Sequence, residues 1–205
     1  MKITQRNFIN FFIVTTLLFI ITCSKNFENI PVYLTFPKNI AKIEGNHALV
    51  IGEDIFNLKK NILSDDCESW AVDLDLENLF INSYVNLSKK MFEEITIIKE
   101  EFNESSFENN LYKTTLILEK NSAFLDFKTE GNKGVFTIIL DSSFKIKGNK
   151  KEVKNNLNSN QTWEKNIYLN CKLSEGSRKA TELAFKQLIN QIHSNIYKSV
   201  LTVTR

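Results

Sequence analysis

The sequence predicts an α+β fold: a mostly antiparallel sheet of about four to six strands, with two amphipathic helices packed on one face. Residues 75–94 and 177–200 place apolar side chains at steps of three and four, which is typical of helices with one buried face. Residues 135–147 instead alternate apolar and polar side chains, as a half-buried strand does. Most of the strands should therefore lie between the two helices in sequence.

Two short strands are expected before the first helix. Residues 32–36 (VYLTF) are β-branched and aromatic and end at Pro37, and residues 47–51 (HALVI) are followed by Gly52 and two acids. Residues 57–68 are polar and show no clear period, so they predict a loop with at most one helical turn.

The first helix is predicted from an apolar stripe that continues for several turns. Asp73 or Asp75 can cap it, because a carboxylate accepts hydrogen bonds from the free amides of a first turn. Residues 96–98 (TII) should then enter a strand after a tight turn, followed by a polar loop over residues 100–110. The stripe consists of Leu76, Phe80, Tyr84, Leu87, Met91 and Ile95, widened by Leu79 and Val85.

Several strands are expected after that loop. Residues 111–119 and 123–128 read as two of them, residues 131–134 (GNKG) as a turn, and residues 135–147 as the next strand. Residues 148–161 are polar and predict a loop. Residues 163–173 resume an alternation that points Trp163, Ile167, Leu169, Cys171 and Leu173 inward.

The closing helix is expected over residues 177–200, with Ser174 or Ser177 as its cap. Residues 202–205 should trail off. Its predicted buried stripe contains Ala180, Leu183, Ala184, Leu188, Ile192 and Ile196.

The first 23 residues predict export from the cytoplasm. Lys2 and Arg6 precede an apolar run over residues 8–21, which is short for a bilayer span but typical of a secretory signal. Cys23 follows Ile20-Ile21-Thr22 and resembles the lipobox of bacterial lipoproteins, which implies that Cys23 becomes the lipid-modified first residue. The expected organisation is a signal peptide over residues 1–22, a tether over residues 23–30 and a single α+β domain over residues 31–205.

Charge argues against nucleic-acid binding. Lys2 and Arg6 are two of the 26 basic residues, and all 24 acids follow residue 22, so the part after the signal is formally neutral. Nucleic-acid binding needs a clustered basic face, which a balanced chain does not indicate.

Cys67 and Cys171 are left once Cys23 is assigned to lipid. In an oxidising compartment the two can form a disulfide, and the alternative is a pair of buried thiols. A catalytic cysteine would need a nearby base, and no local signature surrounds either residue. We expect no catalytic role for them.

The remaining polar patterns favour structural roles. Asp73, Asp75 and Glu77 alternate, but they lack the glycine and the further oxygen ligands of a calcium loop. His47 and His193 would each need further ligands to bind a metal, so we expect no metal site and no cofactor. No hydrolase elbow, phosphate-binding loop or dinucleotide motif occurs. Four aromatic residues could line a groove for an acyl chain or a peptide, but a core role is favoured: Trp70, Phe80, Tyr84 and Phe92.

In the order of these elements the chain resembles the small α/β lipoproteins of the Gram-negative outer membrane, of the LptE (lipopolysaccharide-assembly) and YajG kinds. The resemblance rests on Cys23, the helix DLENLFINSYVNLSKKMFEEI, the strands LYKTTLIL and GVFTIILDSSFKI, and the helix RKATELAFKQLINQIHSNI. The residue after Cys23 is Ser24, which is similar to the residue at this position in outer-membrane lipoproteins. The resemblance implies a lipid-anchored protein of the outer membrane that faces the periplasm.

Two functions remain open at this point. One is a non-enzymatic accessory subunit that binds a protein partner of an envelope assembly, export or maintenance machine, which requires an apolar, poorly charged surface strip. The other is a carrier or chaperone-like lipoprotein for an apolar ligand, which requires an internal cavity of about 300 Å³ or more. For the accessory subunit, a sheet edge or the polar segments 100–110 and 148–161 are the expected contact.

Overall fold

The computed structural model describes residues 32–52, 55–63, 74–99, 112–166 and 173–205. Within them the chain forms an α+β fold with a mixed six-stranded sheet and two helices, which confirms the predicted fold class. The elements, in chain order, are β1 (Ile43–Ile51), β2 (Phe56–Leu63), α2 (Leu76–Met91), β3 (Phe92–Ile98), β4 (Thr114–Glu130), β5 (Lys133–Lys147), β6 (Glu152–Asn166) and α3 (Leu173–Thr204).

The sheet is built on three long antiparallel strands, β4, β5 and β6. Two strands lie in succession along the free edge of β4, and both run parallel to it: β1 pairs with its first part and β2 with its second part. The β4–β5 register shifts between Leu118 and Asn121, at the point where the partner changes from β1 to β2. β3 adds to the far side of β1, also in parallel.

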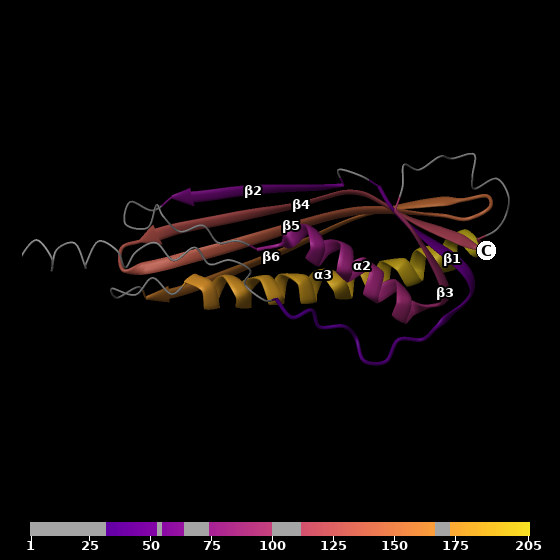
Figure 1. Cartoon of the computed structure of the whole chain (residues 1–205), viewed down its shortest axis with the longest axis horizontal. Coiled ribbons are helices and arrows are strands. Elements are labelled where there is room, and N and C mark those ends of the chain that lie inside the picture. Colours follow the sequence, from indigo (N-terminus) through magenta and orange to yellow (C-terminus); the bar gives the residue numbers. More distant parts are fainter. Residues whose placement is uncertain (1–31, 53–54, 64–73, 100–111, 167–172) are drawn as a thin grey trace, which may run out of the picture.

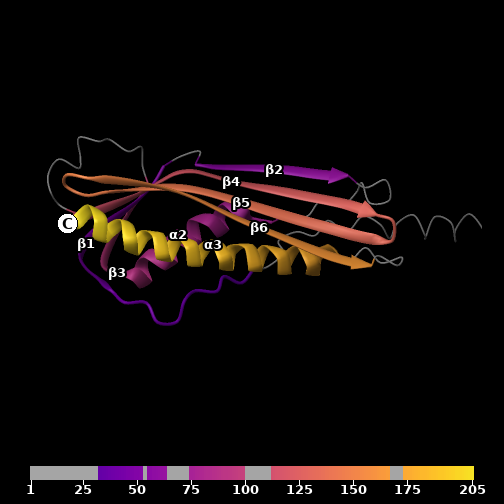
Figure 2. The same cartoon turned by 180° about the vertical axis from the view of Figure 1, so that it is seen from behind.

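Both helices cover the same face of the sheet, as Figures 1 and 2 show from opposite sides. The core lies between the two layers. The inward side chains of β5 are at most 1% exposed and match the predicted alternation: Phe136, Ile138, Leu140, Phe144 and Ile146. The opposite face of the sheet is not covered by either helix.

The first helix follows its predicted stripe closely. Leu76, Phe80, Tyr84, Leu87 and Met91 are all buried. The Oδ1 atom of Asp75 accepts from the amide of Asn78 at 3.3 Å, so Asp75 is the cap; the alternative cap, Asp73, lies outside the described residues. β3 starts directly at Phe92, with no turn between helix and strand.

The segment of residues 148–161, predicted as a loop, lies mostly in β6. Three of its inward side chains are polar, which hides the apolar alternation of a strand. Their polar groups bond to α3: buried Ser159 donates from Oγ to the carbonyl of Ala184 at 2.9 Å, and half-buried Asn155 and Gln161 bond to Ser199 and Gln187. The loop prediction was wrong because these inward polar side chains form hydrogen bonds with α3, where a strand's inward side chains usually make apolar contacts.

Other boundaries also differ from the predictions. Residues 57–63 of the predicted loop 57–68 form most of β2, whose backbone bonds to β4 hold a polar sequence extended. The two strands predicted at 111–119 and 123–128 are one strand, β4, with a bulge. The predicted strand 163–173 ends at Asn166, and Leu173 already belongs to α3, while residues 167–172 lie outside the described residues.

The last helix is longer than predicted, and its predicted buried stripe is confirmed at every position except Leu183. α3 begins at Leu173, so Ser177 is a buried residue inside the helix rather than its cap. Leu183 is 53% exposed, whereas Phe185 and Ile189 are fully buried. Residues 183–185 are all apolar, so periodicity alone could not decide which of them faces the sheet.

Residues 32–42, which we call the strap, form no strand although residues 32–36 were predicted as one. The strap runs along the helix layer, on the side away from the sheet (Figure 1). Its backbone has no strand partner, yet its side chains alternate in burial, and Val32, Leu34 and Phe36 pack against the core. The strand prediction for residues 32–36 was wrong, because the apolar side chains of the strap pack on the helix layer and not in the sheet.

Candidate functional site

The cysteines singled out by the sequence, Cys23, Cys67 and Cys171, lie outside the described residues. The lipid anchor and the disulfide therefore stay predictions. The described part of the chain contains no group of three or more His, Cys, Asp or Glu side chains that could hold a metal ion.

His47 is buried in the sheet, and each of its ring nitrogens has a polar partner. Its Nδ1 lies 2.7 Å from Thr114 Oγ1 on β4, its Nε2 lies 3.2 Å from the carbonyl oxygen of Glu44, and its ring lies 4.5 Å from that of Phe92. Burial lowers the pKa of His47; the carbonyl of Glu44 opposes this, and the charge of Lys113 adds to it. His193, on α3, is only half-buried.

The free energy of unfolding should fall as pH decreases through the ordinary histidine pKa of 6.5. Below that value the unfolded chain binds a proton that folded His47 resists, so the stability that neutral His47 contributes is lost toward acid. Urea unfolding between pH 5 and 8 measures this slope. His47→Gln, which does not titrate, should have a smaller slope, and equal slopes would contradict the assignment.

Three of the four aromatic residues considered for a groove are core residues. Phe80, Tyr84 and Phe92 are at most 2% exposed, and Trp70 lies outside the described residues. The hydroxyl of Tyr84 lies 2.5 Å from Ser142 Oγ, which donates to Asn121 Oδ1 at 2.6 Å beside the β4 bulge. Burial raises the pKa of Tyr84, so this network is neutral and structural.

The outer face of α3 is the most unusual surface of the described residues. Six exposed side chains on it, which we call the outer strip, are separated by three or four residues and so lie along one line of the helix. No charged residue belongs to the strip, and Lys186 and Lys198 flank it. Between residues 183 and 205 the sequence contains no acid. The strip consists of Leu183, Gln187, Asn190, Ser194, Tyr197 and Leu201.

Exposed apolar side chains concentrate on this strip. Four large apolar residues of the described chain are exposed, and three of them belong to it: Leu183 at 53%, Leu201 at 42% and Tyr197 at 40%. The fourth is Tyr33 of the strap, at 68%. Sequence reasoning missed the strip because it assigned Leu183 to the core; the lack of acids after Glu182 was the available signal.

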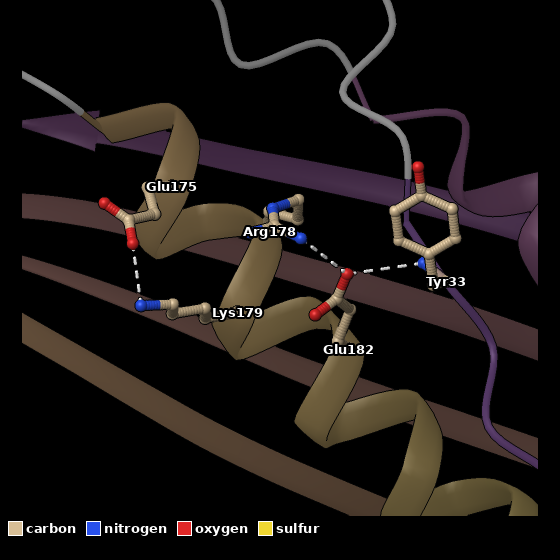
Figure 3. Close-up of polar contacts among 5 residues, drawn as sticks. All are labelled: Tyr33, Glu175, Arg178, Lys179 and Glu182. Carbon is tan, nitrogen blue, oxygen red and sulfur yellow. Dashed lines mark hydrogen bonds and ion pairs between the residues drawn. The ribbon is translucent and has the colours of Figure 1, made fainter.

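The strap meets α3 next to one end of the strip. The amide of Tyr33 donates to Glu182 Oε1 at 3.4 Å, and Arg178 Nη1 donates to the same oxygen at 3.2 Å (Figure 3). Lys179 and Glu175 form a separate ion pair at 2.7 Å one turn away. Exposed Tyr33 is therefore held beside α3 at the Arg178–Glu182 ion pair, next to Leu183 in sequence.

Three pockets lined by described residues lie outside the helix–sheet interface. One, of about 460 Å³, lies on the uncovered face of the sheet around Asp141 and Lys154. The other two, of about 430 and 280 Å³, adjoin each other at the C-terminal end of α3 and share Lys113 and Thr204. All three include charged side chains in their walls, unlike the apolar internal cavity that the carrier alternative requires.

None of the described helices combines the length and the apolar character needed to cross a bilayer. No family model matches the chain, and no curated protein matches it.

Among solved structures, the chain is similar to a neuraminyllactose-binding hemagglutinin homologue from Helicobacter pylori, with 11% identity over 83% of this chain and 94% of that one, and a TM-score of 0.47. Rare lipoprotein B from Shewanella oneidensis shows 17% identity over 71% and 95%, with a TM-score of 0.34. A minor lipoprotein from Acinetobacter baumannii shows 9% over 68% and 88%, with a TM-score of 0.35. TM-scores this low do not establish a shared family or role.

Proposed function

We propose that this chain is a non-enzymatic accessory protein of the bacterial cell envelope, anchored by lipid at Cys23, that binds a protein partner through the outer strip of α3. The signal-like residues 1–22 and the cysteine after them support the anchor. We place the protein at the outer membrane, facing the periplasm, on the resemblance that the sequence shows.

The observation that carries the proposal is the gathering of exposed Leu183, Tyr197 and Leu201 on an uncharged line of one helix. Exposed apolar side chains scattered singly need no explanation, whereas a line of them with depleted charge is typical of the centre of an interface. This is the surface that the accessory-subunit alternative requires.

Charge indicates the chemistry of the partner. Because Lys186 and Lys198 flank the strip and no acid follows Glu182, the complementary surface is uncharged along the strip, apolar opposite its two ends and acidic at its rim. The strip is about 27 Å long and one helix wide. Its area is therefore smaller than the roughly 800 Å² that each partner contributes to a stable interface. The partner must therefore also contact the strap beside it, including Tyr33.

Acidic substitutions on the strip test the proposal. Leu183→Asp/Leu201→Asp should lower recovery of the crosslinked partner at least about tenfold, because the two new charges would face apolar contacts and an acidic rim. Leu183→Lys/Leu201→Lys should lower it less. The measurement is quantitative mass spectrometry after crosslinking of whole envelopes that contain the full chain.

A matched control adds the same charge elsewhere. Asn156→Asp/Asn160→Asp changes two exposed side chains of β6, within the segment 148–161 that the sequence favoured as a contact, and should leave recovery unchanged because the proposal replaces that contact with the strip. A photo-crosslinking residue at Tyr197 should capture the same partner, whereas one at Asn160 should not. Parental recovery by the strip variant, or capture from Asn160 alone, would contradict the proposal.

A further inference from the structure

A basic pocket lies at the end of the molecule where the β5–β6 hairpin meets the last turn of α3. Its volume is about 430 Å³, and it is distinct from the outer strip. Four of its eight lining residues are cations, and none is an acid: Lys113, Lys150, Lys151 and Arg205. Tyr112, Asn149, Val203 and Thr204 complete the wall.

These cations are not neutralised by the part of the chain that the structure describes. The ion pairs formed among described residues involve other side chains. Lys113 Nζ donates to the backbone carbonyl of Glu44 at 3.2 Å, which fixes its position without cancelling its charge. The carbonyls at the end of α3 offset about half an elementary charge and the main-chain carboxylate of Arg205 offsets one more, so more than half of the four positive charges remains.

The fold holds two of the lysines in place. The amide of Gly148 donates to the carbonyl of Lys151 at 2.9 Å and closes the hairpin turn. A Cβ atom at Gly148 would lie 2.7 Å from the carbonyl oxygen of Val203, so only glycine lets the turn approach α3 this closely. Lys150 and Lys151 therefore belong to a turn that packs directly on the helix end.

We propose that this pocket binds a phosphate-bearing anion. A phosphate group offers several oxygens to convergent ammonium and guanidinium donors, and charge-assisted bonds of this kind are stronger than neutral ones. The same chemistry belongs to a free phosphate ion and to the headgroup of an anionic phospholipid. The adjoining pocket, lined partly by Ile43 and Val200, provides apolar contacts that only a lipid would use, and it borders the end of the outer strip at Tyr197 and Leu201.

Titration of the full chain in a neutral detergent tests the site. The probes are inorganic phosphate, dihexanoylphosphatidylglycerol and zwitterionic dihexanoylphosphatidylcholine, followed by isothermal calorimetry at low salt. Lys150→Ala/Lys151→Ala should weaken binding of the anionic probe about tenfold or more, and added salt should weaken it in the parent. The control Lys59→Ala/Lys60→Ala removes two exposed charges from β2 and should have little effect.

Each outcome decides the proposal. Preference for phosphatidylglycerol over both other probes supports the site and identifies the source as a lipid headgroup, whereas binding of inorganic phosphate alone supports a free ion. Equal binding of the two lipids, binding of no probe, or equal losses in both lysine variants would overturn it. The lysine variants test the pocket separately from the outer strip, because they leave Leu183, Tyr197 and Leu201 unchanged.

Discussion

Replacement of Phe185 by alanine is expected to lower the free energy of unfolding by about 3–5 kcal/mol. Phe185 is fully buried, and its ring lies 5.1 Å from that of Phe80 in an edge-to-face arrangement. Phe80 in turn lies 5.0 Å from Phe56 on β2. Three elements therefore meet at this aromatic cluster, and truncation would leave a cavity that rigid neighbours cannot fill.

Leu183→Ala is the matched control, two residues away on the same helix. Because Leu183 is 53% exposed, its truncation should change stability by less than about 0.5 kcal/mol. Urea unfolding of both variants measures the difference. If Leu183→Ala cost as much as Phe185→Ala, Leu183 would face the core and the outer strip would not be exposed.

The sequence predicted elements well where burial alone determines the pattern. β5 has helices on one side and solvent on the other, so its alternation could be recognised in the sequence. The apolar stripe of α2 could be recognised for the same reason, because one face of the helix is buried. Asp75 was recognised as a cap because capping depends on residues close in sequence. The fold class follows from these elements.

The remaining features depend on partners distant in sequence. The inward polar side chains of β6 are explained by their hydrogen bonds to α3, which is distant in sequence. The conformation of the strap likewise depends on the helices that it packs against. The basic pocket combines Lys113 with Lys150 and Lys151 from different segments, so no local motif could reveal it. The outer strip could not be recognised without knowing which residue of 183–185 faces solvent. All three are apolar, so the sequence pattern did not decide this.

Gly176→Ala is expected to destabilise the protein by about 3 kcal/mol, although the same change inside an ordinary helix would stabilise it by about 0.5–1 kcal/mol. Gly176 lies in the first turns of α3, and the six-membered ring of Trp163 packs against its backbone. A Cβ atom at this position would overlap the ring. An aromatic ring cannot bend away, so either the indole or the helix must move.

A double-mutant cycle with Trp163→Ala separates this clash from other effects. Once the ring is absent, the methyl group of Gly176→Ala has space, and the helix preference for alanine should make the change neutral or stabilising. The effect of the glycine substitution would then reverse its sign between the two backgrounds, with a coupling energy of about 3 kcal/mol. An equal cost in both backgrounds would show that β6 and the start of α3 do not pack through Trp163.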